Sequence, residues 1–206
     1  MNKPPKWPAT TALRAGVARG LDSKRGTVDF ENERILGLAV ITEGEARGHG
    51  VFIDAEQVEN VVALGNAKAK GLKNRYGHPN MSSTALGSYM GDETNFYLDH
   101  TPEGLAVARA DLQFAAVAHN APGFAQDPVK YLLQFAHTKP EKFGTSIVFK
   151  RGQYYRRTAE GKKVYRYNQD GSRNQEYSEA PQKEYVEVAE LRANDFEDEV
   201  AANPQG

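Results

Sequence analysis

The hydrophobic pattern of the chain predicts short buried strands. An uninterrupted apolar run between Arg34 and Thr42 predicts a buried strand over 34–42. A second strand is expected over 48–53, after a turn. Apolar residues recur at 144–149 and alternate with acidic ones over 185–191, which predicts two further strands.

Two segments have the signals of amphipathic helices. Asp54 can cap a helix whose capping-box position is held by Gln57, and Gly65 and Gly71 mark its decay and stop. The apolar face of this helix is Val58, Val61, Val62 and Leu64. A second helix is predicted to start at Asp127-Pro128, a cap followed by proline, and to stop at Pro140.

Between these helices the pattern is typical of an antiparallel meander. Strand-like segments at 87–91 and 95–98 precede a turn at 101–104 and a long strand over 105–114. The predicted fold class is therefore α+β: a mostly antiparallel β-barrel or sheet with flanking helices.

Composition narrows the possible chemistry. The 206 residues suit one domain, and the absence of cysteine excludes disulfides, thiolate metal sites and cysteine nucleophiles. No apolar run approaches the roughly 18–20 residues that cross a bilayer, and no secretory signal is seen, so a soluble intracellular protein is expected without a membrane partner. A net charge of −1 makes a nucleic-acid-wrapping protein unlikely on electrostatic grounds.

Charge and composition also suggest boundaries along the chain. Residues 1–27 carry six Lys/Arg and one Asp, so 1–32 is expected to be a flexible basic arm. The main domain is expected over 33–199. Within it, about 150–184 is rich in Tyr, Arg, Gln and Gly without a core pattern, and predicts an exposed, partly mobile hairpin or insertion. Residues 200–206 are expected to form a C-terminal linker.

Common cofactor and metal motifs are missing from the sequence. The five histidines form no pair at ligand spacing, so no metal is expected. No phosphate-binding or dinucleotide-binding glycine loop is present, so no cofactor is expected either. The Gly-x-Ser-x-Gly elbow of α/β-hydrolases is also absent.

Three residues of the types that serine hydrolysis needs remain as candidates. Ser146 lies in an apolar strand, where a hydroxyl without a partner costs roughly 1–3 kcal/mol; bonding to a backbone carbonyl is the common alternative. His78 precedes Pro79 and should end a strand, or lie in a surface turn. Asp111 is the only acid in the 105–114 strand, where it could equally face solvent. In a Ser–His–Asp set, the histidine takes the serine proton and the acid orients the histidine.

Taken in order, several segments resemble the tailed-bacteriophage prohead (capsid maturation) proteases. These segments are Tyr76-Gly77-His78-Pro79, 85–89, 104–107, 110–112, the helix at 129–136, the strand 143–149, 189–196 and 201–204. The resemblance covers roughly 33–204 and lies in the ordered set rather than in any one motif. Val148 departs from the glycine usual in the family, and Val200 from a frequent proline.

The resemblance implies a serine endopeptidase with a herpesvirus assemblin-like fold. It would cleave scaffolding protein and major capsid protein, and itself, inside the assembling procapsid in the host cytoplasm, as a homodimer or higher oligomer. Ser146 would be the nucleophile, His78 the general base and Asp111 the orienting acid, with His49, His119 and Glu103 as other possible partners. A scaffolding segment following Gly206, removed by self-cleavage, is a further expectation.

Two other readings stay open. A catalytically inactive procapsid- or scaffold-binding module could keep the same fold, and Val148 favours it. A nucleic-acid-binding β-barrel could use the Tyr/Arg-rich stretches 154–157 and 165–167, since aromatic rings stack on bases and arginines neutralise phosphates.

Overall fold

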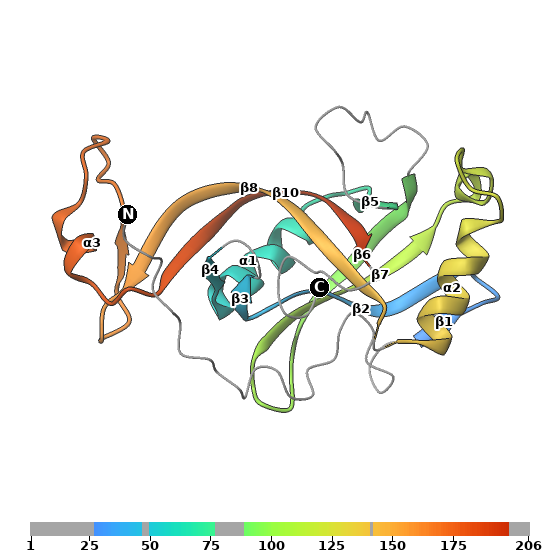
Figure 1. Ribbon diagram of the computed structural model, residues 1–206, viewed down its shortest axis with the longest axis horizontal. Coiled ribbons are helices and arrows are strands. Elements are labelled where there is room, and N and C mark those ends of the chain that lie inside the picture. The colour runs from blue at the N-terminus through green and yellow to red at the C-terminus, as the bar shows by residue number, and fades with distance from the viewer. Residues whose placement is uncertain (1–26, 47–49, 77–88, 141, 198–206) are drawn as a thin grey trace.

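A computed structural model describes residues 27–46, 50–76, 89–140 and 142–197, with the backbone alone for Ser146, Val148 and 192–197. This part of the chain is α+β, as predicted (Figure 1). Its strands are β1 (Thr27–Asp29), β2 (Arg34–Thr42), β3 (Gly44–Ala46), β4 (Val51–Ile53), β5 (Leu72–Tyr76), β6 (Tyr89–His100), β7 (Ala106–Phe114), β8 (Gly144–Arg157), β9 (Lys163–Tyr165) and β10 (Glu184–Glu197). Its helices are α1 (Ala55–Asn66), the 3-10 helix η2 (Ala116–Asn120), α2 (Pro128–Thr138) and α3 (Gln175–Glu179).

The strands pair mostly antiparallel. Backbone hydrogen bonds give the order β1-β2-β7-β6-β5-β10-β4-β3, while β8 pairs with both β10 and β9. Among the described strands, β10 is the one that pairs in parallel, with β4 and with β5. The predicted antiparallel pairing across the 101–104 turn is confirmed as β6-β7. The two segments expected at 87–91 and 95–98 belong to one strand, β6, and the third strand of the meander is β5, which the pattern did not assign to it. β6 is not broken at 92–94 but has a bulge between Thr94 and Tyr97, where Asn95 has a φ of 54°.

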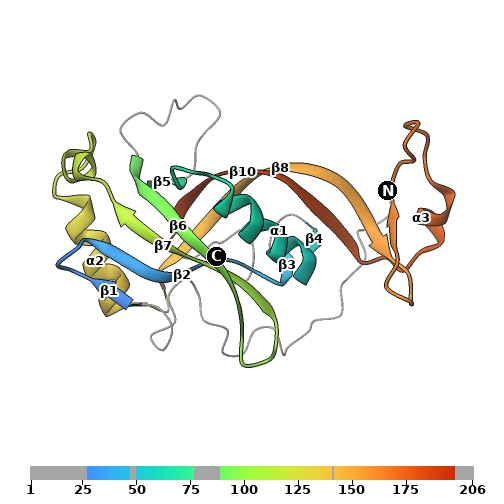
Figure 2. The same ribbon diagram turned by 180° about the vertical axis from the view of Figure 1, so that it is seen from behind.

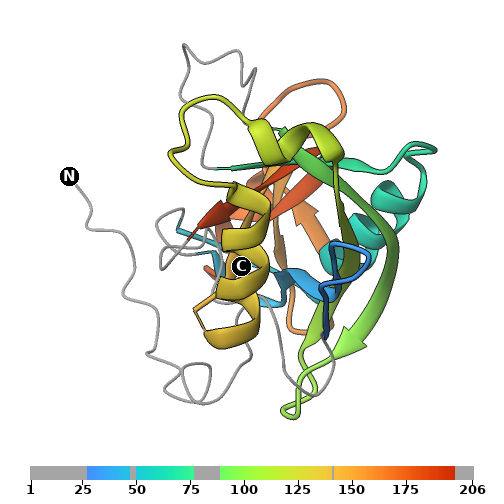
Figure 3. The same cartoon turned by 90° about the vertical axis from the view of Figure 1, so that its right-hand side faces the viewer.

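The sheet form of the prediction is confirmed, and the closed barrel is wrong for the described strands. In those strands β1 pairs only with β2, and β3 only with β4. The sheet nevertheless curls (Figure 3), so that β8 reaches β2, where the Thr145 hydroxyl donates to the Ala39 carbonyl at 3.0 Å. β1 pairs with the start of β2, at 34–36, and β8 meets β2 beyond that stretch, through the side chain of Thr145.

Both long helices begin where the sequence predicts. The Asp54 carboxylate accepts from the Gln57 N–H at 3.0 Å, and the Gln57 side chain accepts from the Asp54 N–H at 3.1 Å, which completes the capping box of α1. Asp127 caps α2, with Pro128 at its first position. Figure 2 shows α1 beneath the arch of β8 and β10, with α2 at the far end of the molecule from α3.

The core divides between the two long helices. Ala106, Ala108 and Ala110 of β7 belong to a hydrophobic cluster that includes Val58 and Val61 of α1. Further along the same strand, buried residues pack with α2 instead. These are Leu112 and Phe114, together with Val129, Leu132, Leu133 and Phe143. The single strand β7 therefore carries both halves of the core. No helix in the described part of the chain is long and apolar enough to cross a membrane.

The segment 150–184 is the hairpin that the sequence predicts, but it is not simply exposed. β8 continues to Arg157 and returns through β9, α3 and β10. Tyr155 is fully buried, and Val164 and Tyr177 are only 2% and 3% exposed. The expectation that this segment lacks a core is wrong, because tyrosines fill the place that aliphatic residues take elsewhere.

The boundary of the basic arm also changes. The arm was expected over 1–32, but Thr27–Asp29 forms β1 and pairs with Arg34–Leu36 of β2. Asp29 accepts hydrogen bonds from the backbone and side chain of Asn32 and from Arg34, which together tie the turn between the strands. Residues 1–26 and 198–206, which hold most of the arm and the expected C-terminal linker, lie outside the described residues.

Candidate functional site

The predicted nucleophile lies where three strands run side by side. Ser146 of β8 is opposite Asp195 of β10, and Asp195 is opposite Arg75 of β5. In the next row, Thr145 is opposite Phe196, which is opposite Tyr76. The end of β5 is therefore separated from the start of β8 by β10 alone.

The backbone at Ser146 is held by buried neighbours. Thr145 and Ile147 on either side are buried, and the Thr145 hydroxyl bonds to Ala39 of β2. This contact fixes the start of β8 against the opposite end of the curled sheet. His78 lies outside the described residues, which resume at Tyr89 after Tyr76, so contact between Ser146 and His78 stays a prediction.

Asp111 has a structural task in this fold. One carboxylate oxygen accepts from the N–H of Gly37 at 2.9 Å, and the other accepts from the side-chain amide of Asn95 at 3.1 Å. Gly37 has a φ of 69° and lies in a bulge of β2. Asp111 thus holds two irregular points of the sheet, in β2 and in β6. Across the curl of the sheet β2 lies between β7 and β8, but both oxygens of Asp111 already accept structural bonds, so its part as orienting acid gains no support.

The other possible partners lie apart from one another. Glu103 is exposed in the turn between β6 and β7. His119 in η2 contacts two carboxylates, Asp127 at 2.9 Å and Glu33 at 3.0 Å. His49 lies outside the described residues. None of the described ones shares the row that contains Ser146.

The strand pairing points to an acid that sequence reasoning missed. Asp195 is directly opposite Ser146 in the antiparallel pair of β8 and β10. Directly opposite residues in such a pair have Cα atoms about 4.5–5.5 Å apart. The sequence carries no signal for this neighbour, because the two positions are 49 residues apart (195 − 146) and only the register joins them.

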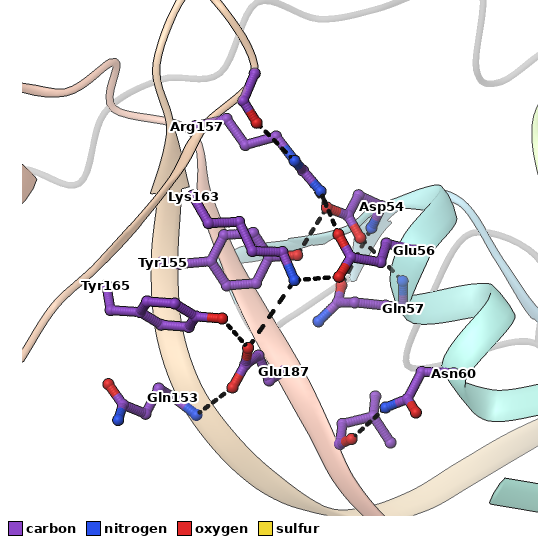
Figure 4. A network of polar contacts seen from close by, with 12 residues as sticks. Asp54, Glu56, Gln57, Asn60, Gln153, Tyr155, Arg157, Lys163, Tyr165 and Glu187 are labelled. Atoms are coloured by element: carbon purple, nitrogen blue, oxygen red, sulfur yellow. Dashed lines mark hydrogen bonds and ion pairs between the residues drawn. The ribbon is translucent and has the colours of Figure 1, made fainter. Parts of the chain in front are cut away.

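A second polar cluster joins the hairpin to α1 (Figure 4). The Tyr155 hydroxyl donates to Asp54 Oδ2 at 2.7 Å, and the Arg157 guanidinium donates to the same oxygen at 2.7 Å and to Glu56 at 2.9 Å. Burial, and then the bond to Asp54, raise the pKa of the Tyr155 phenol well above its usual range. The helix cap Asp54 is thereby the anchor of the hairpin.

The same cluster continues to β9 and β10. Lys163 pairs with Glu56, and the Tyr165 hydroxyl donates to Glu187 at 2.6 Å. A hollow of about 520 Å³ lies beside these residues, between α1 and β10. Its lysine already neutralises one of its carboxylates, and no group of three His, Asp or Glu residues in the described part of the chain is arranged to hold a metal. The cluster thus has a structural role: it holds the hairpin 150–184 against α1.

The Tyr/Arg-rich stretches are likewise engaged internally. Arg156 donates to the Tyr177 carbonyl at 3.0 Å and lies over its ring, 4.2 Å from the centroid. Arg166 pairs with Glu184 and lies over the ring of Tyr154. Arg157 in turn pairs with Asp54 and Glu56. The three guanidinium groups of these stretches are therefore already paired inside the protein, whereas binding of a phosphate backbone would need them free. The Tyr/Arg-rich composition of 154–157 and 165–167 therefore no longer supports nucleic-acid binding.

Comparisons of the chain with protein-family models, with curated proteins and with solved structures found no match. Function is therefore inferred from the geometry of the described residues together with the ordered resemblance of the sequence.

Proposed function

We propose that the chain is a serine endopeptidase in which Ser146 is the nucleophile and His78 the general base. The observation that carries this proposal is the row shared by Tyr76, Phe196 and Thr145. Tyr76 precedes His78 by two residues, and Thr145 is next to Ser146. Two strand spacings amount to about 10 Å between the Cα atoms of Tyr76 and Thr145. The proposal requires the chain after Tyr76 to turn towards β8, so that the His78 side chain comes within hydrogen-bond distance of Ser146.

In this mechanism, His78 takes the proton of the Ser146 hydroxyl as the oxygen attacks a peptide carbonyl. The same imidazolium then protonates the leaving amine, and water hydrolyses the acyl-enzyme. A carboxylate near the histidine would hold its tautomer and stabilise its charged form. We assign this part to Asp195 in preference to Asp111, because Asp195 is opposite Ser146 whereas both oxygens of Asp111 already accept bonds from Gly37 and Asn95.

The substrates in this proposal follow from the sequence resemblance. They are scaffolding protein and major capsid protein, with self-cleavage, inside the assembling procapsid. The assemblin-like fold belongs to the same proposal. The curled, mostly antiparallel sheet with helices at its sides supports it, since β8 approaches β2 through Thr145 and Ala39.

The test is intact mass after treatment with a fluorophosphonate serine probe. We expect one adduct on the wild-type protein, none on Ser146→Ala and a slow one on His78→Ala. Ser178→Ala is the matched control, because Ser178 is exposed on α3, far along the chain from the row at Ser146. Asp195→Asn should slow labelling more than Asp111→Asn.

Two outcomes would overturn the proposal. Absence of an adduct on folded wild-type protein at high concentration would favour the inactive procapsid-binding module instead. Labelling of Ser146→Ala at the wild-type rate would place the reactive group elsewhere. Circular dichroism of each variant distinguishes loss of fold from loss of chemistry.

A further inference from the structure

His119 makes a contact that only its charged form can satisfy. Its Nδ1 lies 2.9 Å from Asp127 Oδ2, and its Nε2 lies 3.0 Å from Glu33 Oε2. A protonated imidazole donates from both nitrogens, whereas the neutral ring has one N–H and one lone pair. In the neutral form, one carboxylate oxygen would face that lone pair at hydrogen-bond distance, so one of the two contacts must open.

These contacts join three parts of the fold. Glu33 is in the turn between β1 and β2, His119 is in η2, and Asp127 is the N-cap of α2. The loop 120–126 runs between the last two, around a hollow of about 520 Å³. Within the loop, Ala121 is buried, and the ring of Phe124 lies edge-on to Tyr76 with centroids 4.8 Å apart.

We propose that His119 is a protonation-dependent clamp on the loop 120–126. When charged, it ties the C-terminal end of η2 to both Glu33 and Asp127, and the loop presents Phe124 to Tyr76, the last residue of β5. When neutral, it releases one carboxylate, and the loop and its contact with Tyr76 loosen. The clamp stands independently of the proposed protease.

The charges facing the ring set the direction of the switch. The bonds to Asp127 and then to Glu33 raise the pKa of His119, and burial opposes them without reversing the shift. Burial alone would raise the pKa of Asp127, but the bonds from His119 and the backbone outweigh it and lower that pKa. Lys130 also faces Asp127, at 3.7 Å. Because the folded-state pKa of His119 lies above its unfolded value of 6.5, the clamp is complete below about pH 6.5 and is lost as the pH rises through the raised value.

The first test is the NMR titration of the histidine rings in wild-type protein, Glu33→Gln and Asp127→Asn. Asparagine can still cap α2, so the second variant removes charge while the helix end stays satisfied. We expect each variant to weaken proton binding by His119 about threefold to fivefold, the range of a partly exposed ion pair. His137, exposed near the end of α2, is the control within the same spectrum. Unchanged titration of His119 in both variants would overturn the clamp.

The second test is hydrogen exchange of amides 120–126, corrected for the intrinsic effect of pH. In the wild-type protein we expect protection to fall about threefold to fivefold between about pH 6 and pH 9, and in His119→Gln to stay constant. If His119→Gln does not fold, Glu33→Gln serves in its place. The same pH dependence in wild-type protein and in the variant would contradict the proposal.

One consequence rests on the proposed function. Since Tyr76 precedes His78 by two residues, loosening of Phe124 should affect serine labelling: the labelling rate of the wild-type protein, divided by that of His119→Gln at the same pH, should fall as the pH rises. If nothing is labelled while His119 titrates as expected, the protease proposal fails and the clamp stands. If labelling occurs but the loop is insensitive to pH, the reverse holds.

Discussion

The Tyr155 hydroxyl donates a hydrogen bond at 2.7 Å to Asp54, a residue 101 positions earlier in the chain. The same carboxylate caps α1 and receives the Arg157 guanidinium. One buried aspartate therefore starts a helix and anchors a hairpin. Removing any one of its three donors should destabilise the fold, because the carboxylate is buried and each lost bond leaves a buried polar group without a partner.

Replacing Tyr155 with phenylalanine tests this anchor. We expect Tyr155→Phe to lower the free energy of unfolding by about 1–2 kcal/mol, since a bond to a carboxylate is lost while the ring stays buried. Chemical denaturation with urea measures the change. Tyr167→Phe is the control: Tyr167 is 49% exposed, and a change within about 0.5 kcal/mol is expected. Equal effects of the two substitutions would contradict the anchor.

Thr145→Val tests whether a single hydroxyl holds the curled sheet together. The side chain is fully buried, and valine keeps its shape while leaving the Ala39 carbonyl without this donor. We expect a loss of about 1–2 kcal/mol in the free energy of unfolding, and slower labelling of Ser146 by the serine probe. Thr94→Val, at an exposed position of β6, should change neither quantity. A neutral Thr145→Val would mean that β8 is held against β2 by packing alone.

Asp111→Ala separates a structural aspartate from a catalytic one. The substitution leaves the N–H of Gly37 without its acceptor at the β2 bulge, which should cost about 1–3 kcal/mol in unfolding free energy. Asp111→Asn keeps an oxygen for that N–H and should cost less. We expect both folded variants to keep most of their serine labelling. Loss of labelling with unchanged stability would restore Asp111 as the orienting acid.

We expect the free energy of unfolding to fall at high pH because of Tyr165. The bond to Glu187, and then burial, raise the pKa of Tyr165 to about 12 from its ordinary value of 10.0. A pKa that is higher in the folded protein gives stability that is complete below about pH 10 and lost as the pH rises towards about 12. Unfolding followed by circular dichroism between these pH values measures the loss. Glu187→Gln should lower the pKa of Tyr165 and flatten the dependence, and an unchanged spectrophotometric titration would contradict it.

Local features of the fold follow from the sequence. The capping box of Asp54 and Gln57, the Asp127-Pro128 start of α2 and the apolar run of β2 are all found where the pattern predicts them. Caps depend on residues two or three positions apart, and a strand or helix face repeats over a few residues. The interactions that start and stabilise each of these elements are therefore made by residues close together in the sequence.

Burial of the hairpin could not be predicted in the same way. Tyr155, Tyr165 and Tyr177 offer no aliphatic pattern, and their hydroxyls need partners before they can enter a core. Those partners, Asp54, Glu187 and Glu184, come from other elements. These carboxylates meet the tyrosine hydroxyls only when the chain is folded.

By itself, the sequence determined the two long helices, the strands with a clear apolar pattern, the α+β class and the residue types that could perform serine hydrolysis. The tertiary structure decided that β10 lies between β5 and β8, that Asp195 is opposite Ser146 and that Asp111 is bound to Gly37. Pairings of this kind join residues 49 to more than 100 positions apart (146 with 195, and 75 with 195). No local pattern specifies them, because the choice among edges depends on the total surface that the whole sheet and both helices bury.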